Sequence, residues 1–105
     1  MKPHKQSISQ LIRDAVRAVD TGADVILYGS RARGDERIDS DWDILVLTDY
    51  PVDLAIERKF RNKIYDVELD TGEAISLFVY SKKQWRTQQS ITPFYENVTQ
   101  EGIVL

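Results

Sequence analysis

Three short apolar segments rich in β-branched and aromatic residues constrain the fold of this chain most strongly. They span residues 23–28, 42–47 and 74–80, and each is bounded by glycine or polar residues. Runs of this length and composition are typical of strands that are largely buried in a sheet. A single charge, Asp43, interrupts the second run. The sequence therefore predicts a small sheet that contains these three strands.

Segments with the periodicity of amphipathic helices separate the apolar runs. Apolar residues recur every three or four positions over residues 7–20, and the same spacing returns between Pro51 and Gly72. Ser81 and Thr92 are suitable N-caps for two further short helices towards the end of the chain. This alternation predicts an α/β fold, a two-layer sandwich in which helices cover a small mixed sheet.

Length and composition fit one compact domain. The chain has 105 residues, of which 42% are apolar and 30% are charged, and these values are typical of a soluble globular domain. We therefore expect residues 1–105 to form a single domain. The first residues lack the apolar stretch of a signal peptide, and no apolar run approaches the roughly 20 residues needed to cross a bilayer. The sequence predicts a cytoplasmic protein with no membrane partner.

Charge and the absence of thiols narrow the partners and cofactors. The formal net charge is −3 and the pI is about 5.1, so no positive excess attracts a phosphate backbone and a nucleic-acid partner is disfavoured. The chain has no cysteine and one histidine, so a bound metal must be held mainly by oxygen atoms. Hard cations such as Mg²⁺ are the natural candidates. A homo-oligomer is compatible with the sequence.

The polar segment that begins at Gly29 holds residues suited to binding phosphate. Gly29 follows a predicted strand, where it permits a tight turn and leaves room for a ligand. The N–H group and hydroxyl of Ser30, at the mouth of any following helical turn, would face an anion such as a triphosphate. Arg31 and Arg33 are further candidates for a triphosphate contact, although loop arginines are mostly solvated surface.

Two aspartates at the next predicted strand are suited to binding metal. Asp41 and Asp43 are two residues apart, so both side chains leave the same face and can converge on one or two divalent cations. Structural pairing with the nearby arginines is the other interpretation, because buried unpaired carboxylates are costly. Phosphoryl and nucleotidyl transfer need an oriented triphosphate and a metal ion, and this part of the chain supplies residues for both.

The complete pattern resembles the minimal nucleotidyltransferases of the DNA polymerase beta superfamily. The signature of that family is Gly-Ser, ten residues, and then Asp-x-Asp. Gly29-Ser30 and Asp41-Trp42-Asp43 match it, with residues 31–40 between them. The preceding strand, the Arg33-Gly34 pair and Ser40 before the first aspartate strengthen the resemblance.

The resemblance implies a nucleotide site next to a magnesium site. Gly29-Ser30 would hold the β and γ phosphates of ATP beside Arg31 and Arg33, while Asp41 and Asp43 would ligate Mg²⁺ and act in catalysis. Members of the family transfer a nucleoside monophosphate to a hydroxyl and release pyrophosphate. Small stand-alone members often pair, as antitoxins, with a helical HEPN protein. The resemblance therefore implies a Mg²⁺-dependent enzyme that moves AMP to a hydroxyl acceptor, with a HEPN toxin as its partner.

One position departs from the pattern of the family. Active members usually carry a third carboxylate on the strand after the central helix, where it completes metal binding and helps to activate the acceptor as a base. In this chain the matching position holds Ser76, which cannot serve as that base, and Glu73 is the nearby acid that could reach inward. The alternative function is therefore a non-catalytic nucleotide- or partner-binding module of the same fold.

Overall fold

The structure, a computed structural model, describes residues 5–105 of the chain. Helices and strands alternate along it in the predicted order, with the two short helices near the C-terminal end. The elements in chain order are α1 (Lys5–Val19), β1 (Asp24–Tyr28), α2 (Ser30–Arg33), β2 (Trp42–Thr48), α3 (Leu54–Thr71), β3 (Ile75–Ser81), α4 (Lys82–Gln88), α5 (Pro93–Glu101) and β4 (Ile103–Val104).

The four strands form one mixed sheet in the order β3-β2-β1-β4. β2 and β3 are parallel, and α3 provides the crossover connection that parallel neighbours require. β1 is antiparallel to both β2 and β4. The prediction of an α/β fold with a small mixed sheet covered by helices is confirmed.

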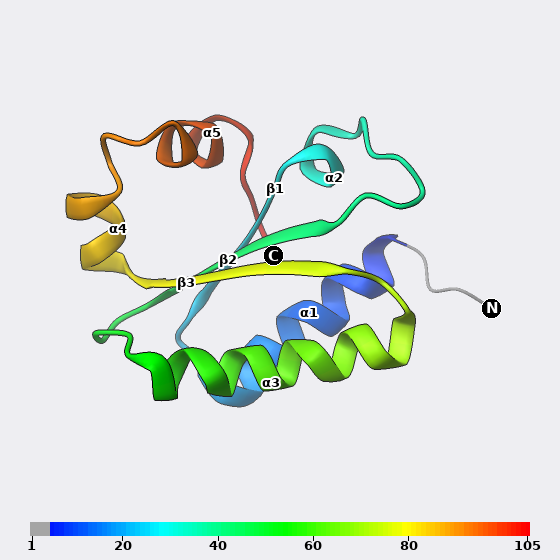
Figure 1. The fold of residues 1–105 in the computed structure, drawn as a ribbon, viewed down its shortest axis with the longest axis horizontal. Coiled ribbons are helices and arrows are strands. Elements are labelled where there is room, and N and C mark those ends of the chain that lie inside the picture. Colours follow the sequence, from blue (N-terminus) through cyan, green and yellow to red (C-terminus); the bar gives the residue numbers. More distant parts are fainter. Residues whose placement is uncertain (1–4) are drawn as a thin grey trace.

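One face of the sheet is closed by α1 and α3, which both lie below it in Figure 1. Alternate residues of each strand point to this face, and they meet the apolar stripes of the two helices. Ile12, Trp42 and Phe60 are each no more than 1% exposed there. The fully buried side chains of this face form the main hydrophobic core. Burial of each large apolar side chain contributes about 1.5–3 kcal/mol to the free energy of folding.

The opposite face is covered by α4 and α5 and is built around aromatic side chains (Figure 1). The ring of Phe94 lies 5.2 Å from those of Tyr28 and Trp85, and 5.3 Å from that of Phe78, between centroids. Phe78 stands on the edge strand β3 and is 44% exposed. This second face is therefore less completely covered than the first. Helices lie on both faces of the sheet, so the arrangement has three layers rather than the two that were predicted.

The predicted caps set the starts of α4 and α5. Ser81 Oγ accepts a hydrogen bond from the N–H of Gln84 at 3.0 Å, and Gln84 Oε1 accepts one from the N–H of Ser81 at 3.1 Å. Thr92 Oγ1 accepts from the N–H of Tyr95 at 3.1 Å. These side-chain oxygens satisfy backbone donors that a helix N-terminus leaves without intrahelical partners. Both N-cap predictions are confirmed.

Two short elements and one boundary differ from the predictions. Residues 30–33 form α2, since the carbonyl of Gly29 accepts from the N–H groups of Ala32 and Arg33 at 3.1 and 3.0 Å. The apolar tail 103–104 forms β4 against β1, and α1 begins at Lys5 rather than at residue 7. A helical turn of four residues and a strand of two are too short to show a periodicity in the sequence.

No helix within residues 5–105 combines the length and the apolar character needed to cross a membrane.

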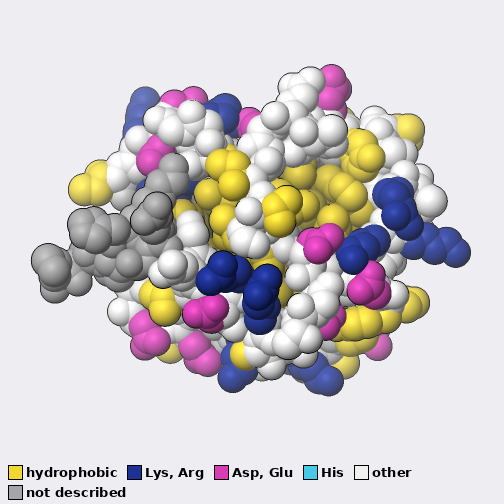
Figure 2. All heavy atoms as spheres, turned by 180° about the vertical axis from the view of Figure 1, so that it is seen from behind, with side chains coloured by type: hydrophobic (Ala, Val, Ile, Leu, Met, Phe, Trp, Pro, Cys, Tyr) yellow, Lys and Arg dark blue, Asp and Glu magenta, His cyan; other side chains and the backbone are white. Residues whose placement is uncertain are grey.

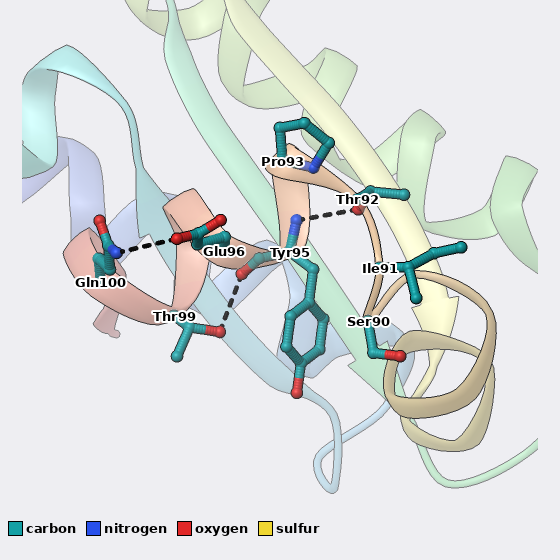
Figure 3. Close-up of a pocket in the computed structure, with 8 residues that line it drawn as sticks. All are labelled: Ser90, Ile91, Thr92, Pro93, Tyr95, Glu96, Thr99 and Gln100. Atoms are coloured by element: carbon teal, nitrogen blue, oxygen red, sulfur yellow. Dashed lines mark hydrogen bonds between the residues drawn. The ribbon is translucent and has the colours of Figure 1, made fainter.

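The surface carries an apolar patch and a hollow. Figure 2 shows apolar side chains gathered near the middle of one side of the molecule. On β4, Ile103 and Val104 are 45% and 72% exposed. A hollow of about 380 Å³ lies on α5 and the loop before it (Figure 3), and neither Asp41 nor Asp43 lines it.

Candidate functional site

The turn at Gly29 is in direct contact with Asp43. Gly29 follows β1 with a φ of 77°, a left-handed conformation that side chains with a Cβ rarely adopt. A Cβ added there would collide with Asp43 Oδ2 and lie 3.1 Å from Asp43 Cγ. Both the dihedral angle and the close approach therefore require glycine. The two halves of the sequence motif, ten residues apart, meet at this point.

Asp41 and Asp43 stand at the start of β2 with their carboxylates available. Trp42 between them turns into the main core, so the alternation of a strand sends its two neighbours to the opposite face. Neither carboxylate makes a hydrogen bond or ion pair with another residue of the described range 5–105. Partial burial, and then the negative charge of Asp41, raise the pKa of Asp43 above its usual value. The pair is thus a locally unfavourable concentration of negative charge.

The chemistry of these donors fits magnesium. Mg²⁺ usually keeps several waters and is held by one or two carboxylates together with substrate phosphates. Two unpaired carboxylates beside a turn without side-chain bulk offer that combination. Within the described residues no three His, Cys, Asp or Glu side chains are grouped to hold a metal ion. Asp41 and Asp43 would hold the ion only with further ligands from a substrate or from water.

Arg31 is directed into the protein rather than towards the carboxylate pair. Its side chain is buried and donates from Nε and Nη2 to the carbonyl of Ser40 at 3.0 and 2.8 Å. The guanidinium lies 4.5 Å over the Trp42 ring and 3.7 Å from Glu73 Oε2. These contacts join α2 to the end of the motif loop, so the geometry favours a role for Arg31 in fixing that loop.

Arg33 faces the site. Its guanidinium is largely exposed and pairs with Glu101 Oε2 at 2.9 Å and with Asp35 Oδ2 at 3.2 Å. Its positive charge lowers the pKa of Asp43, against the larger effects that raise it. Of the two arginines predicted to contact a triphosphate, Arg33 is the one placed beside the carboxylate pair.

Glu101 is the site residue that sequence reasoning missed. It ends α5, and its Oε1 accepts a hydrogen bond from the N–H of Gly29 at 3.1 Å. Its charge also contributes to the raised pKa of Asp43. One signal was present in the sequence, because an acidic residue in the last turn of a helix is opposed by the macrodipole and needs a compensating partner. The Gly29 amide and Arg33 provide that compensation.

Ser30, Ser76 and Glu73 lie in three different places around the carboxylate pair. Ser30 is the first residue of α2, directly after the turn, and is partly exposed. Ser76 of β3 is the register partner of Asp43, so it lies next to that carboxylate in the sheet. Glu73 Oε2 accepts from Trp42 Nε1 at 3.4 Å, which places Glu73 on the opposite side of β2. The structure contradicts the idea that Glu73 reaches the carboxylate pair.

Comparison with known proteins assigns the family. The profile of the nucleotidyltransferase domain family matches residues 8–104. This chain belongs to the nucleotidyltransferase domain family. Comparison with curated protein sequences gives no significant match. The match begins within α1 and ends in β4, so it includes the C-terminal helices α4 and α5.

Solved structures of other proteins have a similar fold. A protein inferred to be a minimal nucleotidyltransferase is 25% identical, with a TM-score of 0.62 and 97% of each chain covered. A toxin–antitoxin crystal structure with AMP-PNP is 19% identical, with a TM-score of 0.66 over 90% of this chain and 69% of the other. A variant of the MntA–HpeT toxin–antitoxin is 17% identical, with a TM-score of 0.60 over 97% and 72%.

Proposed function

We propose that this domain is a Mg²⁺-dependent nucleotidyltransferase that moves AMP from ATP to a hydroxyl acceptor. The observation that carries the proposal is the contact between the Gly29 turn and Asp43. It brings the predicted phosphate-binding turn and the predicted metal-binding carboxylates into one small region. A triphosphate bound at Ser30 would therefore lie within reach of both carboxylates.

Each residue of the site has a distinct part in the proposed transfer. The absence of a side chain at Gly29 lets the phosphates approach the backbone, and Ser30 binds their oxygens at the start of α2. Arg33 neutralises charge on the transferred and leaving groups. Asp41 and Asp43 would hold Mg²⁺, and the ion would supply positive charge to screen the phosphates. The acceptor oxygen bonds to the α-phosphorus, and pyrophosphate leaves with the electron pair of the broken bond.

The position of Ser76 has a consequence for the rate. A carboxylate next to Asp43 on β3 could accept the proton of the acceptor hydroxyl, but Ser76 occupies that place in the sheet. In the proposed reaction the proton passes to water instead. A positioned general base contributes about 10²–10⁴-fold to a rate, so we expect a slow enzyme whose acceleration comes mainly from positioning and charge.

A protein is the proposed acceptor. Two of the structurally similar proteins are toxin–antitoxin complexes, and one was solved with AMP-PNP. By analogy we propose that this chain is the antitoxin partner of a helical HEPN-type toxin and modifies a hydroxyl of that toxin. A protein acceptor also agrees with the net charge of −3, which disfavours a nucleic acid.

Label transfer tests the proposed reaction. The protein would be incubated with Mg²⁺ and ATP labelled at the α-phosphate, with and without a helical HEPN-type protein as the candidate acceptor. We expect label on the helical protein with the wild type and none with Asp43→Asn. Asp39→Asn is the matched control, because it removes an exposed carboxylate of the same loop, outside the proposed metal site. Equal labelling by wild type and Asp43→Asn would refute the proposal.

A second candidate function is a non-catalytic module that works by binding a partner. The presence of Ser76 rather than an acid beside Asp43 favours it. Such a module would inhibit its partner at a one-to-one ratio, and Asp43→Asn would leave that inhibition unchanged. Partner inhibition without any label transfer would support this function over the enzyme.

A further inference from the structure

The carboxylate of Glu101 joins the two groups of the site that are suited to a phosphate. Its Oε1 accepts from the N–H of Gly29 at 3.1 Å, and its Oε2 pairs with Arg33 Nη1 at 2.9 Å. We call this arrangement the carboxylate bridge. A carboxylate and a phosphate compete for the same donors, since both accept charge-assisted hydrogen bonds from amides and guanidinium groups. The bridge thus uses donors that the proposed function assigns to a nucleotide.

The fold holds Glu101 in this place. β4 pairs with β1 so that Leu27 lies opposite Ile103, and continuing this antiparallel register by two residues places Glu101 opposite Gly29. Gly102 permits the approach, because a Cβ there would lie 2.5 Å from the Val98 carbonyl oxygen and 2.9 Å from Ile26 Cγ2. Chain packing therefore fixes the backbone of Glu101 beside the Gly29 turn.

The charges at the bridge oppose a nucleotide. The Glu101 side chain is 19% exposed, so its charge is only partly screened by water. Arg33 is shared between Glu101 Oε2 at 2.9 Å and Asp35 Oδ2 at 3.2 Å, so its positive charge is already paired with carboxylates. A triphosphate that enters this region is repelled by the Glu101 carboxylate, and Arg33, which could bind the phosphates, is already paired with that carboxylate.

We propose that the carboxylate bridge is an autoinhibitory contact, in which Glu101 occupies the phosphate-binding donors and a nucleoside triphosphate must displace it to bind. The inference rests on the proposed function. Displacement needs only rotation of the Glu101 side chain, and β4 remains paired with β1. The wild type therefore binds nucleotide more weakly than the site itself permits.

Nucleotide affinity of a charge-neutral variant tests this inference. Glu101→Gln keeps the size of the side chain and can still accept from Gly29, but it cannot form the ion pair with Arg33. Calorimetry with Mg-ATP should give a dissociation constant about three- to tenfold lower than that of the wild type. Glu96→Gln is the matched control, since Glu96 lies on the same helix, is exposed, and its carboxylate accepts a hydrogen bond from Gln100 Nε2 rather than from the site. It should bind as the wild type does.

The outcomes separate this inference from the proposed function. If the wild type binds Mg-ATP and Glu101→Gln binds it equally or more weakly, the autoinhibitory contact is wrong while the nucleotide site stands. Weaker binding would instead make Glu101 a positioning residue for Arg33. If neither protein binds any nucleotide, the proposed function fails and the inference fails with it.

A measurement on the wild type covers the case in which Glu101→Gln does not fold. The side-chain carboxyl resonance of Glu101 can be followed by NMR as Mg-ATP is added. Displacement predicts a clear change in its chemical shift, with the resonance of Glu96 unchanged. A Glu101 resonance that stays constant while nucleotide saturates the protein would overturn the inference.

Discussion

The two faces of the sheet are built by different rules. The face under α1 and α3 holds a closed apolar core, in which Trp42 and Phe60 are no more than 1% exposed. The face under α4 and α5 leaves Phe78 44% exposed and carries Asp43, at the start of β2, near the charge of Glu101. The buried core of the closed face contributes most of the free energy of folding. That free energy offsets the repulsion between the carboxylates on the more open face.

The largest expected effect tests the closed face. Phe60→Ala removes a fully buried ring and leaves a cavity, which should lower the free energy of unfolding by about 3–5 kcal/mol. Phe78→Ala on the other face should cost less than half as much, because Phe78 is 44% exposed. Urea denaturation followed by fluorescence measures both. Equal losses would show that the two faces do not differ as described.

The next effect compares the two arginines of the motif loop. Arg31→Met breaks two hydrogen bonds to the Ser40 carbonyl and the contact with Trp42, so the free energy of unfolding should fall by about 1–3 kcal/mol. Arg33→Met should change stability by less than about 1 kcal/mol, since its ion pairs are exposed. For Mg-ATP affinity we expect the larger loss from Arg33→Met. A greater loss from Arg31→Met, in protein that is still folded, would assign the triphosphate contact to Arg31.

The smallest effect is a gain in stability. Burial and the neighbouring Asp41 raise the pKa of Asp43 above 3.8, so protonated Asp43 favours the folded state at low pH and this contribution is lost as the pH rises through the raised pKa. At pH 7 Asp43→Asn should therefore be more stable than the wild type by less than about 1 kcal/mol after allowance for solvent screening. The melting temperature should rise by a few degrees.

The pH dependence of that gain is its control. The difference in melting temperature between Asp43→Asn and the wild type should shrink as the pH falls towards 4 and below, where Asp43 becomes neutral. A difference that is constant over the whole range would assign the gain to something other than ionisation of this carboxylate.

The closed face and the paired motif could be predicted from the sequence because both depend on local patterns. The apolar spacing of residues 7–20 and the alternation around Trp42 report burial directly. The meeting of Gly29-Ser30 with Asp41 and Asp43 was predicted from the motif that resembles the family signature, with residues 31–40 between its halves. That meeting is now seen as a steric contact that only glycine allows.

Glu101 and β4 could not be predicted in the same way. The two-residue strand has no periodicity, and its place beside β1 depends on the tertiary packing of α5. The direction of Arg31 was equally invisible, because the sequence does not show that the Ser40 carbonyl lies within reach of its guanidinium. In each case the deciding contact joins residues that only the folded chain brings together, so no local pattern in the sequence indicates it.

Paramagnetic relaxation by Mn²⁺ tests most directly whether the Gly29-Ser30 turn and the Asp41–Asp43 pair share one divalent ion. Mn²⁺ takes oxygen ligands as Mg²⁺ does, and it broadens the NMR signals of nearby amides. Substoichiometric Mn²⁺ with ATP should broaden the amides of Gly29, Ser30, Asp41 and Asp43 together, and excess Mg²⁺ should restore them. Broadening centred on another acidic region, such as Asp49–Asp53, with these four amides unaffected, would contradict the shared site.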